Sequence, residues 1–96
     1  MKTAARVDSN QNEIVTALRK IGAVVLSIAQ VKKAFDILVG FRGKLFMMEI
    51  KDGSKPKSQR KLTSGERGCK VAFESVGVKY HIITSVDEAI RTVTDG

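Results

Sequence analysis

Two acidic residues and one lysine, Asp36, Glu49 and Lys51, lie in stretches of this sequence that are otherwise mostly apolar. A pair of carboxylates supplies the oxygen ligands that Mg²⁺ prefers, and the ion keeps several waters that a phosphate can displace. A lysine beside such an ion can orient an attacking water or stabilise the charge that develops on phosphorus. If the chain brings these three side chains together, they have the chemistry to hydrolyse a phosphodiester.

The two apolar stretches, residues 35–41 and residues 44–51, are predicted to form a β-hairpin, because a glycine-containing pair at 42–43 separates them. A two-residue turn there places the two carboxylates directly opposite each other on one face, with their Cβ atoms about 5 Å apart. The lysine lies two residues further along its strand and therefore on that face too. A four-residue turn over 40–43 shifts the pairing by two residues and preserves the shared face.

Two carboxylates side by side destabilise a strand pair, and their burial without a partner costs more still. A bound divalent cation reverses the sign of this interaction. A second interpretation remains open at this point, namely an edge hairpin with solvated charges in which Glu49 pairs with Lys51 or Lys44. The surrounding sequence has to decide between the two.

That surrounding sequence resembles the PD-(D/E)XK nuclease core, in which an aspartate is followed by a Glu-x-Lys motif on the next strand. The segments DILVGFRGKLFMMEIKDG, KLTSGE and SVDEAI, with the basic loop that carries Gln59, are similar to the small phage-type VRR-NUC domains (virus-type replication-repair nucleases). The resemblance extends from about Val7 to Val93. One departure is Phe35, which stands where the family usually has a proline that shapes the backbone.

The resemblance implies a metal site and several catalytic residues. Asp36 and Glu49, with the backbone carbonyl of Ile50, are the implied ligands of Mg²⁺ or Mn²⁺. Glu13 matches the family's helical glutamate, and Gln59 matches a polar residue that orients the lysine or a phosphate. A solvated helix carboxylate and a solvated loop amide remain the alternatives for those two residues. The implied catalytic set is Asp36, Glu49, Lys51, Glu13 and Gln59.

The implied activity is metal-dependent cleavage of DNA, with branched DNA such as four-way (Holliday) junctions as substrate and a phage or prophage as source. A junction requires two cuts on strands related by approximate two-fold symmetry, and each chain carries one site. We therefore expect a homodimer, which would also cover sheet edges that a small chain leaves open. Two alternatives remain: a nuclease of flap or unbranched DNA, and a non-catalytic basic DNA-binding module.

Composition agrees with a nucleic-acid partner. The 96 residues suffice for one domain, residues 1–96, and 17 Lys and Arg against 10 Asp and Glu give a net charge of +7. No stretch has the apolar length of a membrane span, and the N-terminus lacks the apolar segment of a signal peptide. The single cysteine, Cys69, excludes an internal disulfide and favours the reducing cytoplasm of a bacterial or phage-infected cell.

One loop combines a charge run with residues that break regular structure. Residues 52–61, DGSKPKSQRK, leave the end of the strand that carries the Glu-x-Lys motif, so a mobile basic loop there can grip phosphates beside the metal. A solvated linker is the alternative. Residues 31–34 add a second short basic turn. The DNA-binding candidates are Lys32, Lys33, Lys55, Lys57, Arg60 and Lys61.

The remaining sequence predicts the elements that position this site. A loose arm over residues 1–8 precedes a helix that begins near Asp8–Asn10 and ends at Gly22, and a strand follows over 23–30. Capping boxes at 63–66 and 85–88 begin two further helices, with a strand over 78–84 between them. The first of these helices is expected to bury Cys69, Ala72, Phe73 and Val76. The order α-β-β-β-α-β-α predicts a single α/β domain with a mixed sheet and flanking helices, as in a PD-(D/E)XK core.

Overall fold

The computed structural model describes residues 9–28, 31 and 34–95 of the chain. The expected arm over residues 1–8 and two of the DNA-binding candidates, Lys32 and Lys33, lie outside the described residues. The elements are α1 (Gln11–Lys20), β1 (Val24–Ser27), β2 (Ile37–Phe41), β3 (Lys44–Ile50), the short 3₁₀ helix η1 (Lys57–Gln59), α2 (Ser64–Ser75), β4 (Tyr80–Ile83) and α3 (Val86–Asp95).

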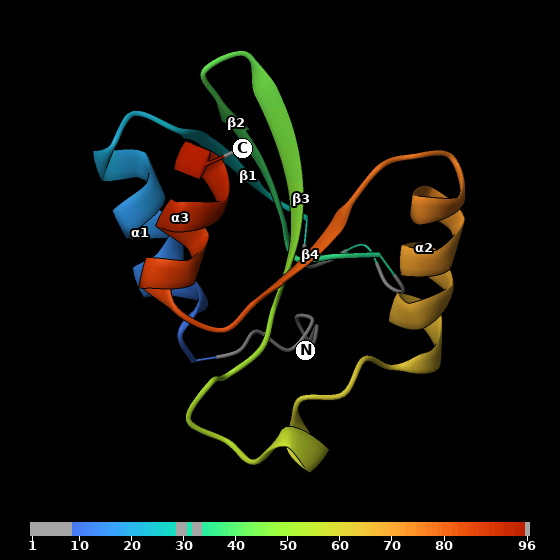
Figure 1. Cartoon of the computed structure of the whole chain (residues 1–96). Helices are drawn as coiled ribbons and strands as arrows, with labels where there is room; N and C mark the ends of the chain where they lie inside the picture. The colour runs from blue at the N-terminus through green and yellow to red at the C-terminus, as the bar shows by residue number, and fades with distance from the viewer. Residues whose placement is uncertain (1–8, 29–30, 32–33, 96) are drawn as a thin grey trace, which may run out of the picture.

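The four strands form one mixed sheet in the order β1-β2-β3-β4 (Figure 1). The first two pairs are antiparallel, whereas β3 and β4 are parallel and are connected through η1 and α2. A parallel pair needs such a crossover, since a tight turn can join only antiparallel strands. The predicted order α-β-β-β-α-β-α and the mixed sheet are confirmed, and η1 is an addition within a loop that was expected to hold no regular structure.

The turn between β2 and β3 has the two-residue form that fixes the register. Arg42 and Gly43 both have positive φ, 50° and 81°, as the mirror-image turns of two-residue hairpins require. The strands pair from Phe41 with Lys44 to Ile37 with Met48. The alternative four-residue turn is thereby excluded.

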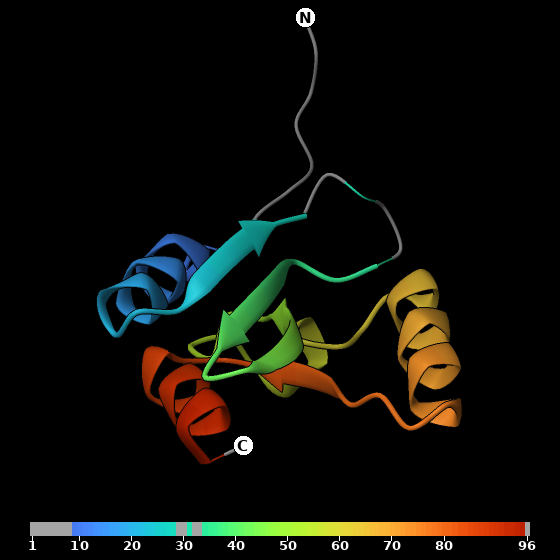
Figure 2. The same cartoon turned by 90° about the horizontal axis from the view of Figure 1, so that it is seen from above.

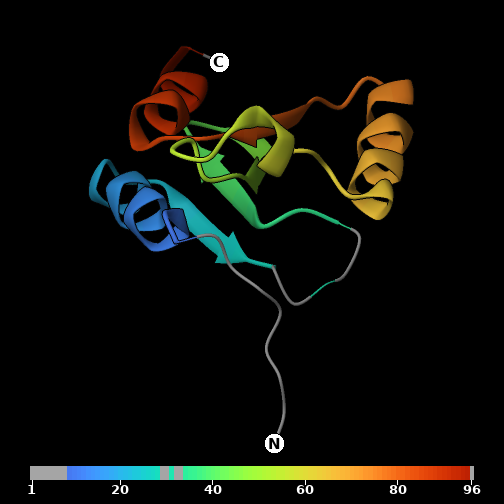
Figure 3. The same cartoon turned by 90° about the horizontal axis from the view of Figure 1, so that it is seen from below.

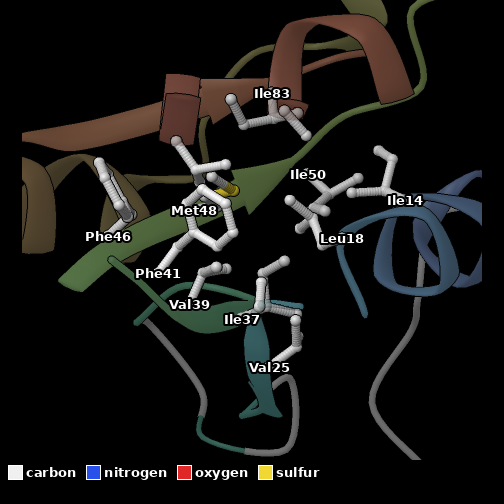
Figure 4. Packing of buried hydrophobic residues seen from close by; sticks show 13 residues of the cluster. Ile14, Leu18, Val25, Ile37, Val39, Phe41, Phe46, Met48, Ile50 and Ile83 are labelled. Carbon is white, nitrogen blue, oxygen red and sulfur yellow. The ribbon is translucent and has the colours of Figure 1, made fainter. Parts of the chain in front are cut away.

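The hydrophobic core lies between one face of the sheet and the helices α1 and α3, which lie side by side there (Figures 1 and 2). Ile14 and Leu18 of α1 point toward Ile37, Met48 and Ile83 of the sheet (Figure 4). Ala89 and Val93 of α3 are buried in the same cluster. The helical spacing of these apolar residues therefore places two helices on one side of the sheet.

The other helix, α2, stands on the opposite side of the sheet from α1 and α3 (Figure 3). None of the residues Ser64–Ser75 that form it is buried; Phe73 is 40% exposed, and Val76, which directly follows the helix, is 74% exposed. The expectation that Cys69, Ala72, Phe73 and Val76 enter the core was wrong. Spacing identifies the apolar side of a helix, but α2 meets the sheet mainly at β4 and leaves that side largely uncovered.

The face of the sheet opposite the core is partly open because of this arrangement. Val24 and Leu45 lie on either side of Gly40 in one cross-strand row and are 74% and 73% exposed. Leu26, two residues along β1, is 57% exposed. We call Val24, Leu26 and Leu45 the open sheet face. Among the described helices, none is long and apolar enough to cross a membrane.

The predicted N-terminal capping residues are present at α2 and α1, but only those of α2 form the cap hydrogen bonds. Thr63 and Glu66 form a complete capping box at α2, with both reciprocal hydrogen bonds present. Asn10 precedes α1 as expected, but its side chain makes no cap hydrogen bond. It donates instead to the backbone carbonyls of Lys51 and Thr84, both at 3.2 Å. Asn10 therefore ties the start of α1 to the ends of β3 and β4, which carry the candidate site.

Candidate active site

Asp36 lies immediately before β2 and reaches across to β3. Its backbone N–H donates to Met48 O at 3.0 Å, and its Oδ2 accepts the backbone N–H of Ile50 at 2.7 Å. The strand ladder ends at Ile37 and Met48, so the expected direct pairing of Asp36 with Glu49 falls one step beyond it. The carboxylate nevertheless lies close enough to Glu49 for its charge to affect the pKa of that residue.

Glu49 and Lys51 point away from the core, toward α2. The Lys51 Nζ lies 3.3 Å from Glu49 Oε2, and the Glu49 residue is only 3% exposed. Glu66, at the start of α2, accepts a hydrogen bond from the same ammonium at 3.1 Å. The hairpin and α2 thus bring a lysine between two glutamates, with Asp36 next to one of them.

Burial and the neighbouring acids together determine the protonation state of Glu49. Burial, then the charge of Asp36 and a hydrogen bond with Glu66, raises the pKa of Glu49 to about 9. The ammonium of Lys51 opposes this shift without cancelling it. At neutral pH the Glu49 carboxyl therefore holds a proton, which is the state expected of a buried acid beside other acids when no cation neutralises them.

Lys51 and Glu66, the two neighbours of Glu49, both favour their charged forms. Burial lowers the pKa of Lys51, but the hydrogen bond to Glu66 and the charges of both glutamates outweigh it, so the pKa lies above its usual value. Burial likewise raises the pKa of Glu66, but the Thr63 N–H and Lys51 bring it below the usual value. Lys51 and Glu66 are therefore a charged pair at neutral pH.

Two predicted residues lie apart from this group. Glu13 is exposed on α1 and lines a shallow pocket with Asp52, Gly53 and Ser54, just beyond the end of β3. Gln59 is exposed at the end of η1, and in the described structure no hydrogen bond joins its side chain to Lys51. The roles implied for these two residues stay predictions.

The basic loop leaves the site through a tight turn. Asp52 accepts hydrogen bonds from the backbone N–H and the hydroxyl of Ser54, at 2.9 and 2.7 Å. Beyond it, Arg60 is partly buried. The other candidate DNA-binding cations of this loop are exposed, as contact with phosphates requires, and are Lys55, Lys57 and Lys61.

The donor chemistry fits a hard divalent cation. Asp36, Glu49 and the backbone carbonyl of Ile50 offer oxygen ligands, and Mg²⁺ commonly binds to one or two carboxylates and completes its shell with water. The part of the chain that the structure describes holds no ready-made group of three or more His, Cys, Asp or Glu side chains for a metal. A cation would replace the proton that burial and repulsion keep on Glu49.

Glu66 is the site residue that the sequence did not reveal. Its capping role was predicted and is present, since its Oε1 accepts the backbone N–H of Thr63 at 3.0 Å. Its contact with Lys51 depends on where the 52–63 segment places α2, which local sequence does not specify. The one signal in the sequence was that an acid in a capping box follows a basic loop that leaves a candidate catalytic strand.

The fold and the site together define a mixed α/β domain that presents an acid pair and a lysine where the start of β2 lies next to the end of β3. A solved structure described as a VRR_NUC domain is similar to this chain, with a TM-score of 0.63 and 18% identity over 88% of this chain and 95% of that one. The chain therefore has the fold of a VRR_NUC domain, as the sequence resemblance predicted. No protein-family model and no curated protein matches the sequence.

Proposed function

We propose that this protein is a metal-dependent endonuclease that hydrolyses phosphodiester bonds in DNA. One observation carries the proposal: Lys51 lies 3.3 Å from Glu49, and the charge of Asp36 acts on Glu49, where the two central strands of a sheet with the VRR_NUC fold lie side by side. A non-catalytic DNA-binding module has no need for a buried acid next to a second acid, because carboxylates near phosphates weaken binding.

Each residue of the site has a distinct role in this reaction. Asp36 and Glu49 would hold Mg²⁺ or Mn²⁺, which when bound supplies positive charge to the phosphoryl oxygens. Lys51 offers an ammonium that orients the attacking water or stabilises charge on phosphorus. Glu66 fixes that ammonium through the 3.1 Å hydrogen bond. The exposed lysines of the basic loop hold the DNA backbone next to the site.

Branched DNA, and four-way junctions in particular, is the substrate class that we propose. The support comes from the resemblance to VRR-NUC domains, from the net charge of +7 and from the open sheet face. A homodimer that covers this face would carry two sites on one substrate, as cleavage of strands related by two-fold symmetry requires. Leu45 and Glu49 are four residues apart on β3, or roughly 13 Å, so the contact would leave the site accessible.

Cleavage of labelled linear, flap and four-way DNA in Mg²⁺, Mn²⁺ or EDTA tests the proposal. Wild type should cut the four-way junction in either metal and lose activity in EDTA. Glu49→Gln and Lys51→Ala should each lower the rate by orders of magnitude while DNA binding persists. Lys79→Ala removes an exposed lysine outside the site and should cut normally. Equal cutting by wild type and Lys51→Ala would refute the proposed role of the lysine.

A further inference from the structure

Tyr80 is buried in β4 and makes two contacts with the segment that leads into β2. Its hydroxyl donates to the backbone carbonyl of Ala34 at 2.9 Å. Its ring meets that of Phe35 edge to face, with centroids 6.4 Å apart and planes at 83°. Only 3% of the Tyr80 residue is exposed, so both contacts are sheltered from water.

The segment that Tyr80 holds ends at Asp36, which is outside the regular strand. Hydrogen bonds that help to locate Asp36 include its N–H to Met48 O, its carbonyl from the Ile28 N–H, and its Oδ2 from the Ile50 N–H. These bonds hold Asp36 only while the backbone immediately before it keeps Asp36 in place, and that backbone depends on other contacts. Tyr80 supplies a polar and an aromatic contact to the two residues that come immediately before Asp36.

The contact also crosses the sheet. Tyr80 pairs with Met47 of β3, whereas Asp36 precedes β2 on the far side of that strand. The tyrosine side chain therefore spans β3 on the face that carries Glu49. Tyr80 thus links β4, on one side of the β3 strand, to the segment that leads into Asp36 on the other side.

We infer that Tyr80 is a positioning residue for the Asp36 carboxylate, acting through Ala34 and Phe35. The hydrogen bond holds the backbone carbonyl of Ala34 against β4, and the ring contact holds the side chain of Phe35 there. Removal of either contact lets Asp36 move relative to Glu49, which changes how well the two acids hold a common cation. The link between this positioning and metal binding rests on the proposed function, whereas the positioning itself does not.

The test uses two variants and a matched control. Tyr80→Phe removes the hydrogen bond and keeps the ring, while Phe35→Leu removes the ring contact and keeps the hydrogen bond. Phe46→Leu is the control, because Phe46 is also buried, belongs to the core cluster that excludes Tyr80 and Phe35, and has its ring 5.9 Å from that of His81. All three variants are compared at the same fraction folded, so that general loss of stability is accounted for.

The first readout is metal-free amide hydrogen exchange at Ile50, whose N–H donates to Asp36 Oδ2. Tyr80→Phe and Phe35→Leu should each speed this exchange about tenfold relative to the control, since local opening exposes the amide. Exchange at Ile50 that matches the control in both variants would overturn the inference. This readout needs no activity and no metal.

The second readout is the binding of Mn²⁺, followed by its electron paramagnetic resonance signal. Tyr80→Phe and Phe35→Leu should each weaken binding about tenfold, the low end of the loss seen when outer partners of metal ligands are removed. Saturating Mn²⁺ should then restore the cleavage rate, as expected when positioning alone is impaired. Unchanged Mn²⁺ affinity in both variants would overturn the metal-binding part of the inference. A wild type that binds no Mn²⁺ would overturn the proposed metal site, while exchange at Ile50 would still decide the positioning.

Discussion

The Nζ of Lys51 and the backbone N–H of Thr63 donate to the same oxygen of Glu66, with Lys51 at 3.1 Å and Thr63 at 3.0 Å. One carboxylate oxygen thus begins α2 and holds the candidate catalytic lysine. Since none of the residues of α2 is buried, this polar contact is a principal attachment of the described helix to the sheet. The stability of α2 and the position of Lys51 are therefore coupled through a single side chain.

Substitution of Glu66 should separate its two roles. Glu66→Ala removes both the capping acceptor and the partner of Lys51, and should cost about 1 kcal/mol of unfolding free energy, or roughly 4–8 °C in melting temperature. Glu66→Gln keeps an oxygen for Thr63 and should retain most of that stability. Both variants should cleave DNA more slowly, because residue 66 then no longer presents a carboxylate to Lys51. Thermal melts and single-turnover cleavage measure the two effects.

Glu88→Gln is the matched control for this prediction. Glu88 accepts the backbone N–H of Thr84 at 2.7 Å near the start of α3, and among the described residues no hydrogen bond or ion pair joins it to Lys51. Its substitution should change the melting temperature about as little as Glu66→Gln does and leave cleavage intact. A Glu66→Gln protein that cleaves like Glu88→Gln would show that Glu66 only caps α2.

Metal binding should release protons from Glu49. Because burial and the neighbouring acids raise its pKa to about 9, Glu49 is protonated at pH 7 and must lose that proton to bind a cation. Addition of Mn²⁺ at pH 7 in weakly buffered solution should release close to one proton per bound ion. The apparent affinity should rise by up to roughly tenfold per pH unit until pH approaches 9. Glu49→Gln should release none, and a pH-independent affinity would contradict the raised pKa.

The same pKa makes a prediction for the metal-free stability. The folded-state pKa of Glu49 lies above the unfolded value of 4.5, so the native state binds more protons between these two values. The contribution of this group is therefore complete below pH 4.5 and is lost as pH rises toward 9. Urea unfolding should show wild type losing stability over this range relative to Glu49→Gln, whose amide does not titrate. Parallel curves would contradict the prediction.

Local chemistry explains how much of this molecule could be predicted from its sequence. The hairpin and the two possible registers of its strands could be predicted from the Arg42-Gly43 pair, and the positive φ of both residues in the structure selects the two-residue turn. The capping box at Thr63 is equally local. These features depend on residues within a few positions of one another, so sequence spacing was sufficient.

The failures concern contacts between distant segments. Spacing identifies the apolar side of α2, yet Val76 is 74% exposed because nothing local determines which surface covers a helix. Glu66 and Lys51 are 15 residues apart, and Asn10 reaches Lys51 over 41 positions. Asp36 also departs from the ideal ladder, because its carboxylate turns to the Ile50 N–H.

Asp36→Asn should remove metal binding without unfolding the protein. The amide oxygen can still accept the Ile50 N–H, so the fold should lose little stability, whereas Asp36→Ala leaves that N–H without its partner at a cost of about 1–3 kcal/mol. Mn²⁺ should raise the melting temperature of wild type by binding to the native state, and should not raise that of Asp36→Asn. Equal shifts in both proteins would show that Asp36 is not a ligand.

The basic loop should set the salt dependence of DNA binding. Simultaneous change of Lys55, Lys57, Arg60 and Lys61 to glutamine should weaken binding and flatten the plot of log K against log salt, by about 0.9 for each duplex phosphate that the loop no longer neutralises. A control with the same charge change replaces Lys20, Arg42, Lys79 and Arg91, which are exposed elsewhere. Fluorescence anisotropy from 50 to about 200 mM salt measures both slopes. The loop does not bind phosphates if its variant keeps the wild-type slope.

The open sheet face should form the two-fold contact of a homodimer. Val24 and Leu26 of β1 and Leu45 of β3 expose aliphatic surface on either side of β2, and apolar surface of this kind is covered in most stable proteins. Sedimentation at micromolar concentration should therefore give twice the chain mass of 10.5 kDa. Leu45→Glu should give the monomer, because a two-fold symmetric contact would bury one new carboxylate from each subunit in the same interface. Ile21→Glu, 39% exposed at the end of α1, should remain a dimer.

The dimer also predicts how the two cuts are divided. After subunit exchange with excess Glu49→Gln, most wild-type chains are paired with an inactive partner, so each heterodimer should nick one strand of a four-way junction without completing the second cut. Leu45→Glu alone should nick slowly and should not yield paired cuts, while its Mn²⁺ affinity stays at the wild-type value because Leu45 is roughly 13 Å from Glu49 along β3. A wild type that sediments as a monomer both free and on the junction would refute the dimer and favour a simple nicking or flap nuclease.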